Sequence, residues 1–257
     1  MRRFYIENID DVSVIISGSE AHHIKNVLRF DIGAEVLLFD GKGKEFKALI
    51  QEFLLFNSGP AVKLKIVEEI RKDIESKIKI NLFQSIPKFK KFDFIIEKST
   101  ELGVDKIIPV ISERSSFDLS SVKISGKLSR WRKIAVSAAG QCGRILVPEV
   151  VNPTKFADAV NAVPRITGNE SFSGSRYISI IPWECEQETS LKQVLKHIGS
   201  NISVINLFVG SEGGFSNVEI ELAEKNGIVP VSLGKRILRV ETAAIAVMAN
   251  LFYEFEQ

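Results

Sequence analysis

Residues 207–219, LFVGSEGGFSNVE, surround one carboxylate with three glycines directly after an apolar run. Gly210, Gly213 and Gly214 would let a ligand approach the backbone closely, and Glu212 lies between them. Glycine loops between a strand and a helix commonly bind phosphate, but this spacing matches neither the dinucleotide fingerprint nor the P-loop, and a carboxylate would repel a phosphate. The loop therefore indicates an uncharged or cationic ligand. The plainer interpretation is a tight turn with a surface glutamate.

This loop is expected to lead into a helix. Ser216 and Glu219 have the spacing of a capping box, in which each side chain accepts a hydrogen bond from the other residue's backbone. A glycine at position 227 is a typical helix stop. We predict a helix over 217–226.

Two further loops share the expected position of the glycine loop. Ligands of open α/β sheets bind beyond the carboxyl ends of the strands, and loops follow the apolar runs YISIIP and IVPVS. The first loop begins with Trp-Glu at 183–184. The second brings Arg236 and Arg239 close to Glu241 and Thr242, at the start of an apolar helix. These residues either form part of a ligand site or serve only as helix-start charges and a cap.

The sequence changes character along its length. The first ~70 residues read as short strands with a hairpin turn at Asp40-Gly41, which predicts a small β-barrel or sandwich. From residue 78 onward strands and helices alternate, which predicts an α/β domain with a mostly parallel sheet. The charged stretch 68–77 separates the two, and we place the domains at 1–72 and 73–257. The expected strands are 3–8, 13–17, 35–40, 45–53, 61–70, 78–86, 106–111, 177–182, 204–210 and 228–234, and the expected helices are 91–102, 128–141, 155–163, 190–198, 217–226 and 242–255.

The composition of the whole chain limits the class of protein. It has 257 residues, 45% of them apolar, enough for one large core or two modest ones. No apolar run approaches the ~18 residues of a membrane span, and the first residues lack the apolar region of a secretory signal, so we expect a cytoplasmic protein. Cys142 and Cys185 have no second Cys or His at metal spacing, so neither a disulfide framework nor a zinc site is indicated. The polar stretch 167–175 is expected to be a mobile loop.

Basic residues gather in four clusters although the net charge is only +2. Each cluster alone is typical of a solvated face, whereas four in a nearly neutral chain favour a polyanionic partner. The clusters are His22, His23, Lys25 and Arg29; Lys42, Lys44 and Lys47; Lys88, Lys90 and Lys91; and Arg130, Arg132 and Lys133.

Five motifs occur in an order that resembles one known family. They are HIKNVLR (23–29), KFDFIIEKSTELGV (91–104), RWRKIAVSAAGQCGR (130–144), VGSEGGFS (209–216) and LGKRILRVETA (233–243). Together they resemble the bacterial 16S ribosomal RNA (uracil-N3)-methyltransferases of the SPOUT class, over nearly the whole chain. The resemblance implies a PUA-like β-barrel for RNA, then an α/β domain with a trefoil knot, and methylation of N3 of a specific uridine in the small ribosomal subunit.

The resemblance also implies a homodimer, and the last expected helix agrees with it. This helix carries an apolar face whose burial one subunit would not complete. The face consists of Ala243, Ala244, Val247, Met248, Leu251, Phe252 and Phe255.

The implied cofactor is S-adenosylmethionine, a sulfonium cation without phosphate, which suits a glycine loop that holds Glu212. The backbone of 233–238 would hold the adenine above an apolar floor. The residues expected to bind the cofactor are Val209, Gly210, Glu212, Gly213, Gly214, Leu233, Gly234, Ile237, Leu238 and Thr242. No metal is expected.

Catalysis at uracil N3 requires loss of a proton and stabilisation of the charge that spreads onto O2 and O4. We expect Arg239 to be the stabilising cation, with Arg236 second. Glu212 and Glu241 both remain candidates for the general base. The residues expected to contact RNA are His23, Lys25, Arg29, Lys88, Lys90, Lys91 and Arg144. His22 and His23 are equally explained as ordinary helix-start residues.

The chain departs from the family pattern at three positions. Ser211 stands where the glycine motif usually has proline, which frees the backbone torsion there. Ser137 and Gly140 stand where glutamates are usual, so roles of those acids cannot be transferred. Gly140 is expected to destabilise its helix by up to ~1 kcal/mol relative to alanine.

Two other functions stay open on the sequence alone. A non-catalytic RNA-binding assembly factor would keep the same fold, although the intact glycine loop argues against it. A nucleotide-dependent oxidoreductase is disfavoured because no dinucleotide fingerprint is present.

Overall fold

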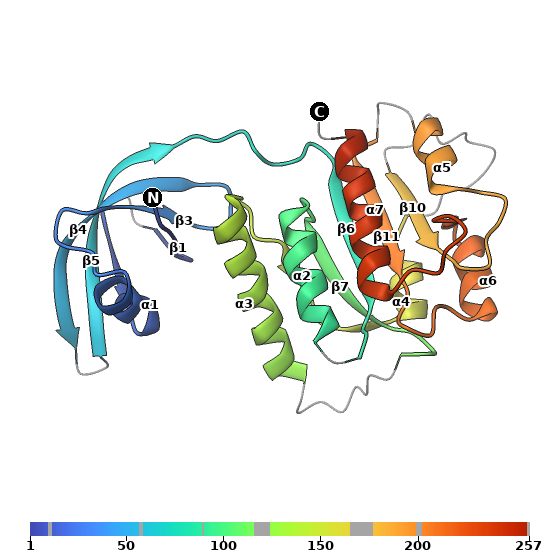
Figure 1. The fold of residues 1–257 in the computed structure, drawn as a ribbon, viewed down its shortest axis with the longest axis horizontal. Helices are drawn as coiled ribbons and strands as arrows, with labels where there is room; N and C mark the ends of the chain where they lie inside the picture. The colour runs from blue at the N-terminus through green and yellow to red at the C-terminus, as the bar shows by residue number, and fades with distance from the viewer. Residues whose placement is uncertain are drawn as a thin grey trace. The chain divides into compact units, whose positions relative to one another are not determined.

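The computed structural model describes residues 1–9, 12–56, 59–88, 90–115, 124–164, 177–198 and 202–255 (Figure 1). Contacts between Cα atoms divide the chain into two compact units, one of 1–75 with 139–147 and one of 76–138 with 148–257. The expected domains at 1–72 and 73–257 stay a prediction. The stretch 167–175 lies outside the described residues.

The first unit is built on a five-stranded sheet in the order β1-β3-β4-β5-β2. Its pairs are antiparallel except for β1 with β3. Its elements are β1 (Arg3–Tyr5), β2 (Ser13–Ser17), α1 (Ser19–His22), the π-helix η1 (His23–Val27), β3 (Glu35–Phe39), β4 (Glu45–Phe56) and β5 (Gly59–Ile70). All five expected strands are thus confirmed.

The hairpin between β3 and β4 forms where the sequence predicts it. The Asp40 carboxylate accepts hydrogen bonds from the backbone N–H groups of Lys42 at 2.7 Å and Lys44 at 3.0 Å. Gly41 has φ 71°, a left-handed conformation that disfavours other residues. The side chain of the turn's first residue therefore fixes the register of the two strands.

Arg3 connects β1 to the segment 139–147 of the same unit. Its guanidinium donates to the carbonyl oxygens of Ala139 at 3.0 Å, Gly140 at 3.1 Å and Arg144 at 2.9 Å. Its Nε lies 2.6 Å from Oε1 of Glu45, which is fully buried. Ala139 and Gly140 lie in the last turn of the helix that ends at Cys142, and Arg144 follows it, so Arg3 binds the C-terminal end of that helix from a distant strand.

Glu75 holds the same segment from the other end of the N-terminal chain. Its Oε1 accepts the backbone N–H groups of Ile145 at 2.8 Å and Leu146 at 2.9 Å, and its Oε2 pairs with Arg144 at 2.9 Å. Residues 139–147 are therefore a structural part of the first unit.

The second unit contains a parallel sheet in the order β12-β10-β11-β6-β7-β8, with β9 also paired to β7. Its strands are β6 (Lys79–Ser85), β7 (Lys106–Ile111), β8 (Glu149–Val150), β9 (Thr154–Lys155), β10 (Tyr177–Pro182), β11 (Val204–Val209) and β12 (Val229–Val231). Its helices are α2 (Lys91–Glu101), α3 (Ile124–Cys142), α4 (Phe156–Ala162), α5 (Leu191–His197), α6 (Asn217–Lys225) and α7 (Val240–Phe255). The expected parallel α/β sheet is confirmed, and the last turn of α3 belongs to the first unit.

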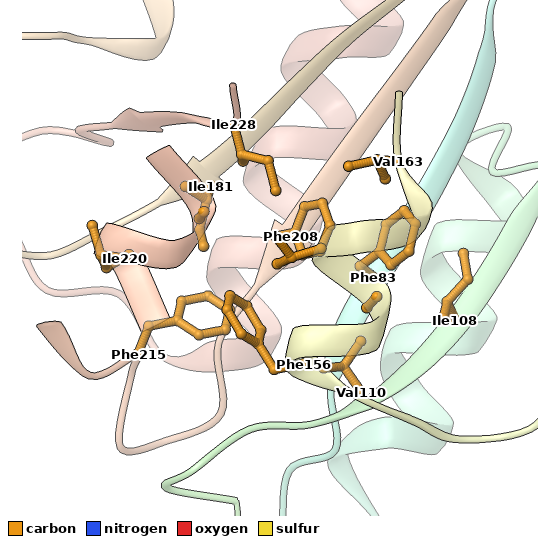
Figure 2. Close-up of a cluster of buried hydrophobic side chains, with 13 residues drawn as sticks. Phe83, Ile108, Val110, Phe156, Val163, Ile181, Phe208, Phe215, Ile220 and Ile228 are labelled. Atoms are coloured by element: carbon orange, nitrogen blue, oxygen red, sulfur yellow. The ribbon is translucent and has the colours of Figure 1, made fainter. Parts of the chain in front are cut away.

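One face of this sheet is covered by α4 and α6 through an aromatic core (Figure 2). The rings of Phe83 on β6 and Phe208 on β11 stack with centroids 4.3 Å apart. Phe156 on α4 meets Phe208 edge-on at 6.1 Å and Phe215 at 5.1 Å. Because Phe215 belongs to the glycine loop, this core anchors the loop.

The helices α2 and α7 lie side by side on the sheet (Figure 1). On α7, Ala244, Val247, Met248 and Leu251 are fully buried, as the apolar pattern predicts. Phe252 of the same face is 42% exposed, in keeping with the expectation that one subunit does not complete the burial of this face. Ala243 and Phe255 are only partly buried. None of the helices formed by described residues is long and apolar enough to cross a membrane.

The helix after the glycine loop begins as predicted. The Ser216 hydroxyl accepts the N–H of Glu219 at 3.3 Å, and the Glu219 carboxylate accepts the N–H of Ser216 at 2.9 Å. This reciprocal pair is the expected capping box. The helix ends at Lys225, just before Gly227 with φ 76°.

Candidate functional site

Three loops leave the same edge of the parallel sheet and surround a cavity. The register pairs Pro182 with Val231 and Ile180 with Leu207, so β10, β11 and β12 end level with one another. The cavity has a volume of about 560 Å³. It is lined by Lys91, residues 182–184, 209–215 and 232–240, and Ala243. The three loops that the sequence singles out are therefore neighbours in space.

Nine of the ten residues predicted to bind a cofactor line this cavity. They are Val209, Gly210, Glu212, Gly213, Gly214, Leu233, Gly234, Ile237 and Leu238. Thr242 is exposed and lies outside the described lining. Cofactor binding by these residues stays a prediction.

The loop's own crowding explains its three glycines. A Cβ at Gly213 would lie 2.9 Å from Cβ of Arg114, and a Cβ at Gly210 would lie 3.2 Å from Cα of Gly214. Gly214 has φ 66°, and a Cβ there would collide with the Glu184 carboxylate. The sequence attributed the glycines to a ligand's approach; contacts within the protein also favour glycine at these positions, and the approach of a ligand stays a prediction.

The loop after β7 is hydrogen-bonded to the glycine loop, a contact that sequence reasoning missed. Arg114 Nη1 donates to the carbonyl of Gly213 at 2.9 Å, and the Ser211 hydroxyl donates to the carbonyl of Arg114 at 3.3 Å. The Ser216 hydroxyl donates to Glu113 Oε2 at 2.6 Å. The sequence signal that could have identified this loop was its place in the chain, since it also follows the carboxyl end of a parallel strand.

Glu212 is held in a charged contact at the cavity wall. Its Oε1 lies 3.0 Å from Lys91 Nζ, which is also 3.7 Å from Oε2 of Glu241. The backbone N–H of Lys88 lies 3.2 Å from each oxygen of Glu212. Lys91, predicted as an RNA contact, thus lines the cavity and lies beside the carboxylates of Glu212 and Glu241.

These contacts set the protonation of Glu212. Burial raises the pKa of its carboxyl, but hydrogen bonds from Lys91, its own backbone and Lys88, together with the Lys91 charge, outweigh this and hold the pKa below its ordinary value of 4.5. The hydrogen bond to Glu212 raises the pKa of Lys91 above 10.5. Both groups are therefore charged at neutral pH, and Glu212 is a weak proton acceptor.

The sequence has known relatives over its whole length. Residues 74–252 match the family model described as RNA methyltransferase domain, and residues 16–53 match RNA methyltransferase PUA domain. The chain belongs to this RNA methyltransferase family. The methyltransferase is similar to "Ribosomal RNA small subunit methyltransferase E" of Buchnera aphidicola subsp. Schizaphis graminum, with 32% identity over 98% of this chain and 96% of the relative. The protein of that name from Bacillus subtilis is 30% identical over 100% of this chain and 98% of its own.

Two solved structures resemble the methyltransferase closely. The ribosomal RNA small subunit methyltransferase E of Neisseria gonorrhoeae, bound to S-adenosyl methionine, is 34% identical with a TM-score of 0.81, covering 98% of this chain and 96% of that one. A putative methyltransferase of Legionella pneumophila in complex with the bound cofactor SAM is 30% identical with a TM-score of 0.83, covering 97% and 96%.

Two arginines of the methyltransferase line the cavity with free guanidinium groups. Arg236 and Arg239 are both exposed. Neither side chain makes a hydrogen bond or ion pair with any residue of the described ranges. Each is therefore able to interact with a ligand that carries negative charge. Within those ranges, no group of three His, Cys, Asp or Glu residues could hold a metal ion.

The predicted RNA contacts separate into accessible and inaccessible residues. His23, Lys25 and Arg29 are exposed around η1 of the first unit, where Lys25 Nζ lies 5.3 Å from the ring centre of Phe53. Lys88 and Lys90 are exposed in the second unit.

Arg144 is a correction to these predictions. Its side chain is 8% exposed and forms the ion pair with Glu75. A buried guanidinium with a carboxylate partner is not accessible to a phosphate, so its role is to hold residues 139–147 in the first unit. Motif position alone could not distinguish this role from RNA contact.

Proposed function

We propose that the protein uses S-adenosylmethionine to methylate N3 of a specific uridine in 16S ribosomal RNA of the small ribosomal subunit. The observation that carries this proposal is the cavity at the sheet edge, where the glycine loop meets the loop 232–240. Relatives at 30% identity and above are named small subunit methyltransferases, and one such structure contains the cofactor.

The described residues fit this cofactor. The volume of about 560 Å³ lies within the range of small-molecule sites, roughly 300–1,000 Å³. The wall carries the carboxylate of Glu212, and Oε2 of Glu241 lies behind it, 3.7 Å from the lining residue Lys91 and buried without a hydrogen-bond partner among the described residues. The lining carries Glu184 and Glu212 beside Lys235, Arg236 and Arg239, so it offers partners for both the positive sulfur and the carboxylate of the cofactor. The backbone of 233–238 would hold the adenine, with Ile237 and Leu238 against it.

When bound, S-adenosylmethionine would supply a methyl group carried on a positively charged sulfur. The chain's own contribution is to orient the uracil, accept the N3 proton and stabilise the charge left on O2 and O4. Arg239 is the stabilising cation in this proposal and Arg236 its neighbour, since both guanidinium groups are free. Glu241 is the better base, because both oxygens of Glu212 already accept hydrogen bonds that favour its ionised form.

RNA binding would fall to the first unit, through His23, Lys25 and Arg29, with Lys88 and Lys90 on the second. The finer fold follows the family resemblance: a PUA-like barrel, a SPOUT-type trefoil knot and a homodimer in the cytoplasm. Sedimentation at micromolar concentration should give a dimer. A monomer that methylates RNA would reject that part of the proposal.

A labelling experiment tests the activity. The protein is incubated with methyl-labelled S-adenosylmethionine and either assembled small subunits or free 16S RNA, and the nucleosides are analysed by mass spectrometry. We expect labelled N3-methyluridine, with more from assembled subunits. Cofactor binding without any transfer would favour the alternative function, a non-catalytic RNA-binding assembly factor of the same fold.

A further inference from the structure

Lys91 occupies an unusual place in the cavity wall. Of the described residues that line the cavity, it alone comes from α2, while the others come from the loops after β10, β11 and β12 and from α7. Its ammonium lies 3.0 Å from Glu212 in the glycine loop and 3.7 Å from Glu241 in the first turn of α7. One side chain therefore connects the glycine loop with the first turn of α7.

The surroundings of the two carboxylates give this bridge a specific effect. Glu212 receives one further donor, the backbone N–H of Lys88. Oε2 of Glu241 has no hydrogen-bond partner among the described residues. Among those residues, its cationic neighbour is Lys91, whose Nζ lies 3.7 Å away. The other titratable side chains of the lining are Glu184, Lys235, Arg236 and Arg239, and none of these has an ion pair with Glu212 or Glu241 in the described ranges.

We propose that Lys91 is a positioning residue of the cofactor cavity, whose ammonium holds the Glu212 and Glu241 carboxylates together and compensates their charge, and that it does not contact RNA. The ligand named here rests on the proposed function, but the geometry of the bridge does not. The adjacent Lys90 is exposed and has no ion pair with any described residue. With Lys88, it is an RNA-facing member of the cluster in this proposal.

The bridge has a consequence for the choice between cofactor and product. S-adenosylmethionine carries a positive charge on sulfur, and S-adenosylhomocysteine does not. With Lys91 present, the carboxylates are already paired with a cation. Without Lys91, the uncompensated carboxylates would favour the sulfonium of S-adenosylmethionine over the neutral sulfur of S-adenosylhomocysteine. Partial desolvation increases this preference, because opposite charges attract more strongly there than in water.

The first test needs no ligand. The protein is labelled with ¹³C at the glutamate side-chain carboxyl, and the Glu212 signal is identified by its absence in Glu212→Gln. In Lys91→Met the titration midpoint of Glu212 should rise by about half a pH unit or more. In Lys90→Met it should stay at the wild-type value, and Lys91→Arg should restore it. An unchanged midpoint in folded Lys91→Met would overturn the proposal.

The second test compares ligands. By calorimetry, the ratio of the dissociation constant of S-adenosylhomocysteine to that of S-adenosylmethionine should rise about threefold or more in Lys91→Met and stay constant in Lys90→Met. RNA affinity should fall in Lys90→Met only, with a salt dependence flatter by about one ion. The reverse pattern would make Lys91 the phosphate contact and reject the proposal. If the wild-type protein binds neither ligand, the proposed function fails, while the carboxyl titration still decides the role of Lys91.

Discussion

Replacement of Gly213 by alanine separates two explanations of the glycine loop. In the structure the new Cβ would lie 2.9 Å from Cβ of Arg114, 3.4 Å from its Cδ and 3.6 Å from its carbonyl oxygen. The backbone of Gly213 is not in the left-handed region, so the substitution adds crowding without torsional strain. If the contact with Arg114 requires this glycine, Gly213→Ala should destabilise the protein even without cofactor.

The magnitude follows from what must move. Overpacking typically destabilises by about 1–3 kcal/mol. Arg114 is exposed and can yield, but a shift disturbs its 2.9 Å hydrogen bond to the Gly213 carbonyl, which contributes about 0.5–1.5 kcal/mol. We therefore expect a loss of about 1–2 kcal/mol in the free energy of unfolding.

A double-mutant cycle in urea, with the cofactor-free protein, measures this coupling. Arg114→Gly removes the crowding Cβ, so the double variant should be more stable than the sum of the single effects by about 0.5–1 kcal/mol. Gly126→Ala, whose Cβ meets nothing within 4 Å, is the control and should show no coupling. The reasoning is refuted if Gly213→Ala leaves cofactor-free stability unchanged and only weakens S-adenosylmethionine binding, because the glycine would then serve the ligand.

Three other predictions follow from the structure. Gly140→Ala should stabilise the protein by about 0.4–1 kcal/mol, because alanine favours the helix and its Cβ would lie 3.5 Å from the nearest side-chain atoms, an ordinary contact. A lower urea midpoint at constant slope would contradict this. Arg239→Ala should lower the single-turnover methylation rate at saturating RNA and cofactor, whereas Lys25→Ala should weaken RNA binding and spare that rate; rescue of Arg239→Ala by more RNA would reverse the assignment. The Glu212–Lys91 pair should contribute equally to stability and cofactor affinity at every pH between the ordinary pKa values of 4.5 and 10.5. Glu212, whose pKa is lowered, loses its contribution only as the pH falls below that window, and Lys91, whose pKa is raised, only as the pH rises above it; calorimetry that finds a titration of this pair between pH 6 and 9 would disprove the prediction.

Much of the fold was predictable because its signals are local. Apolar alternation and helical spacing identified the strands and helices that position the site, and Ser216 with Glu219 predicted the start of α6. The meeting of three loops followed from a general rule on parallel sheets. These inferences use residues within a few positions of one another, where geometry is set by the backbone.

The remaining features depend on pairs far apart in the sequence. Arg144 has the same formal charge as Lys25, and only the fold buries one of them against Glu75 and leaves the other exposed. Lys91 joined a basic cluster in the sequence but faces carboxylates more than a hundred residues away. The exposure of Phe252 likewise depends on what covers α7, which spacing along one helix does not reveal.

The hydrogen bonds of Arg3 join a residue at the start of the chain to carbonyl groups that are synthesised much later. Its carbonyl acceptors at Ala139, Gly140 and Arg144 leave the ribosome long after β1 to β5 are complete. At about 5–20 residues per second, the chain between positions 75 and 144 takes roughly 4–14 s to translate. During that interval the nascent N-terminal sheet exists without these carbonyl partners, and Arg3 beside the buried Glu45 has no helix end to bind. A chain that stops between positions 75 and 138 would therefore contain all five strands of the sheet but none of the carbonyl groups that Arg3 binds.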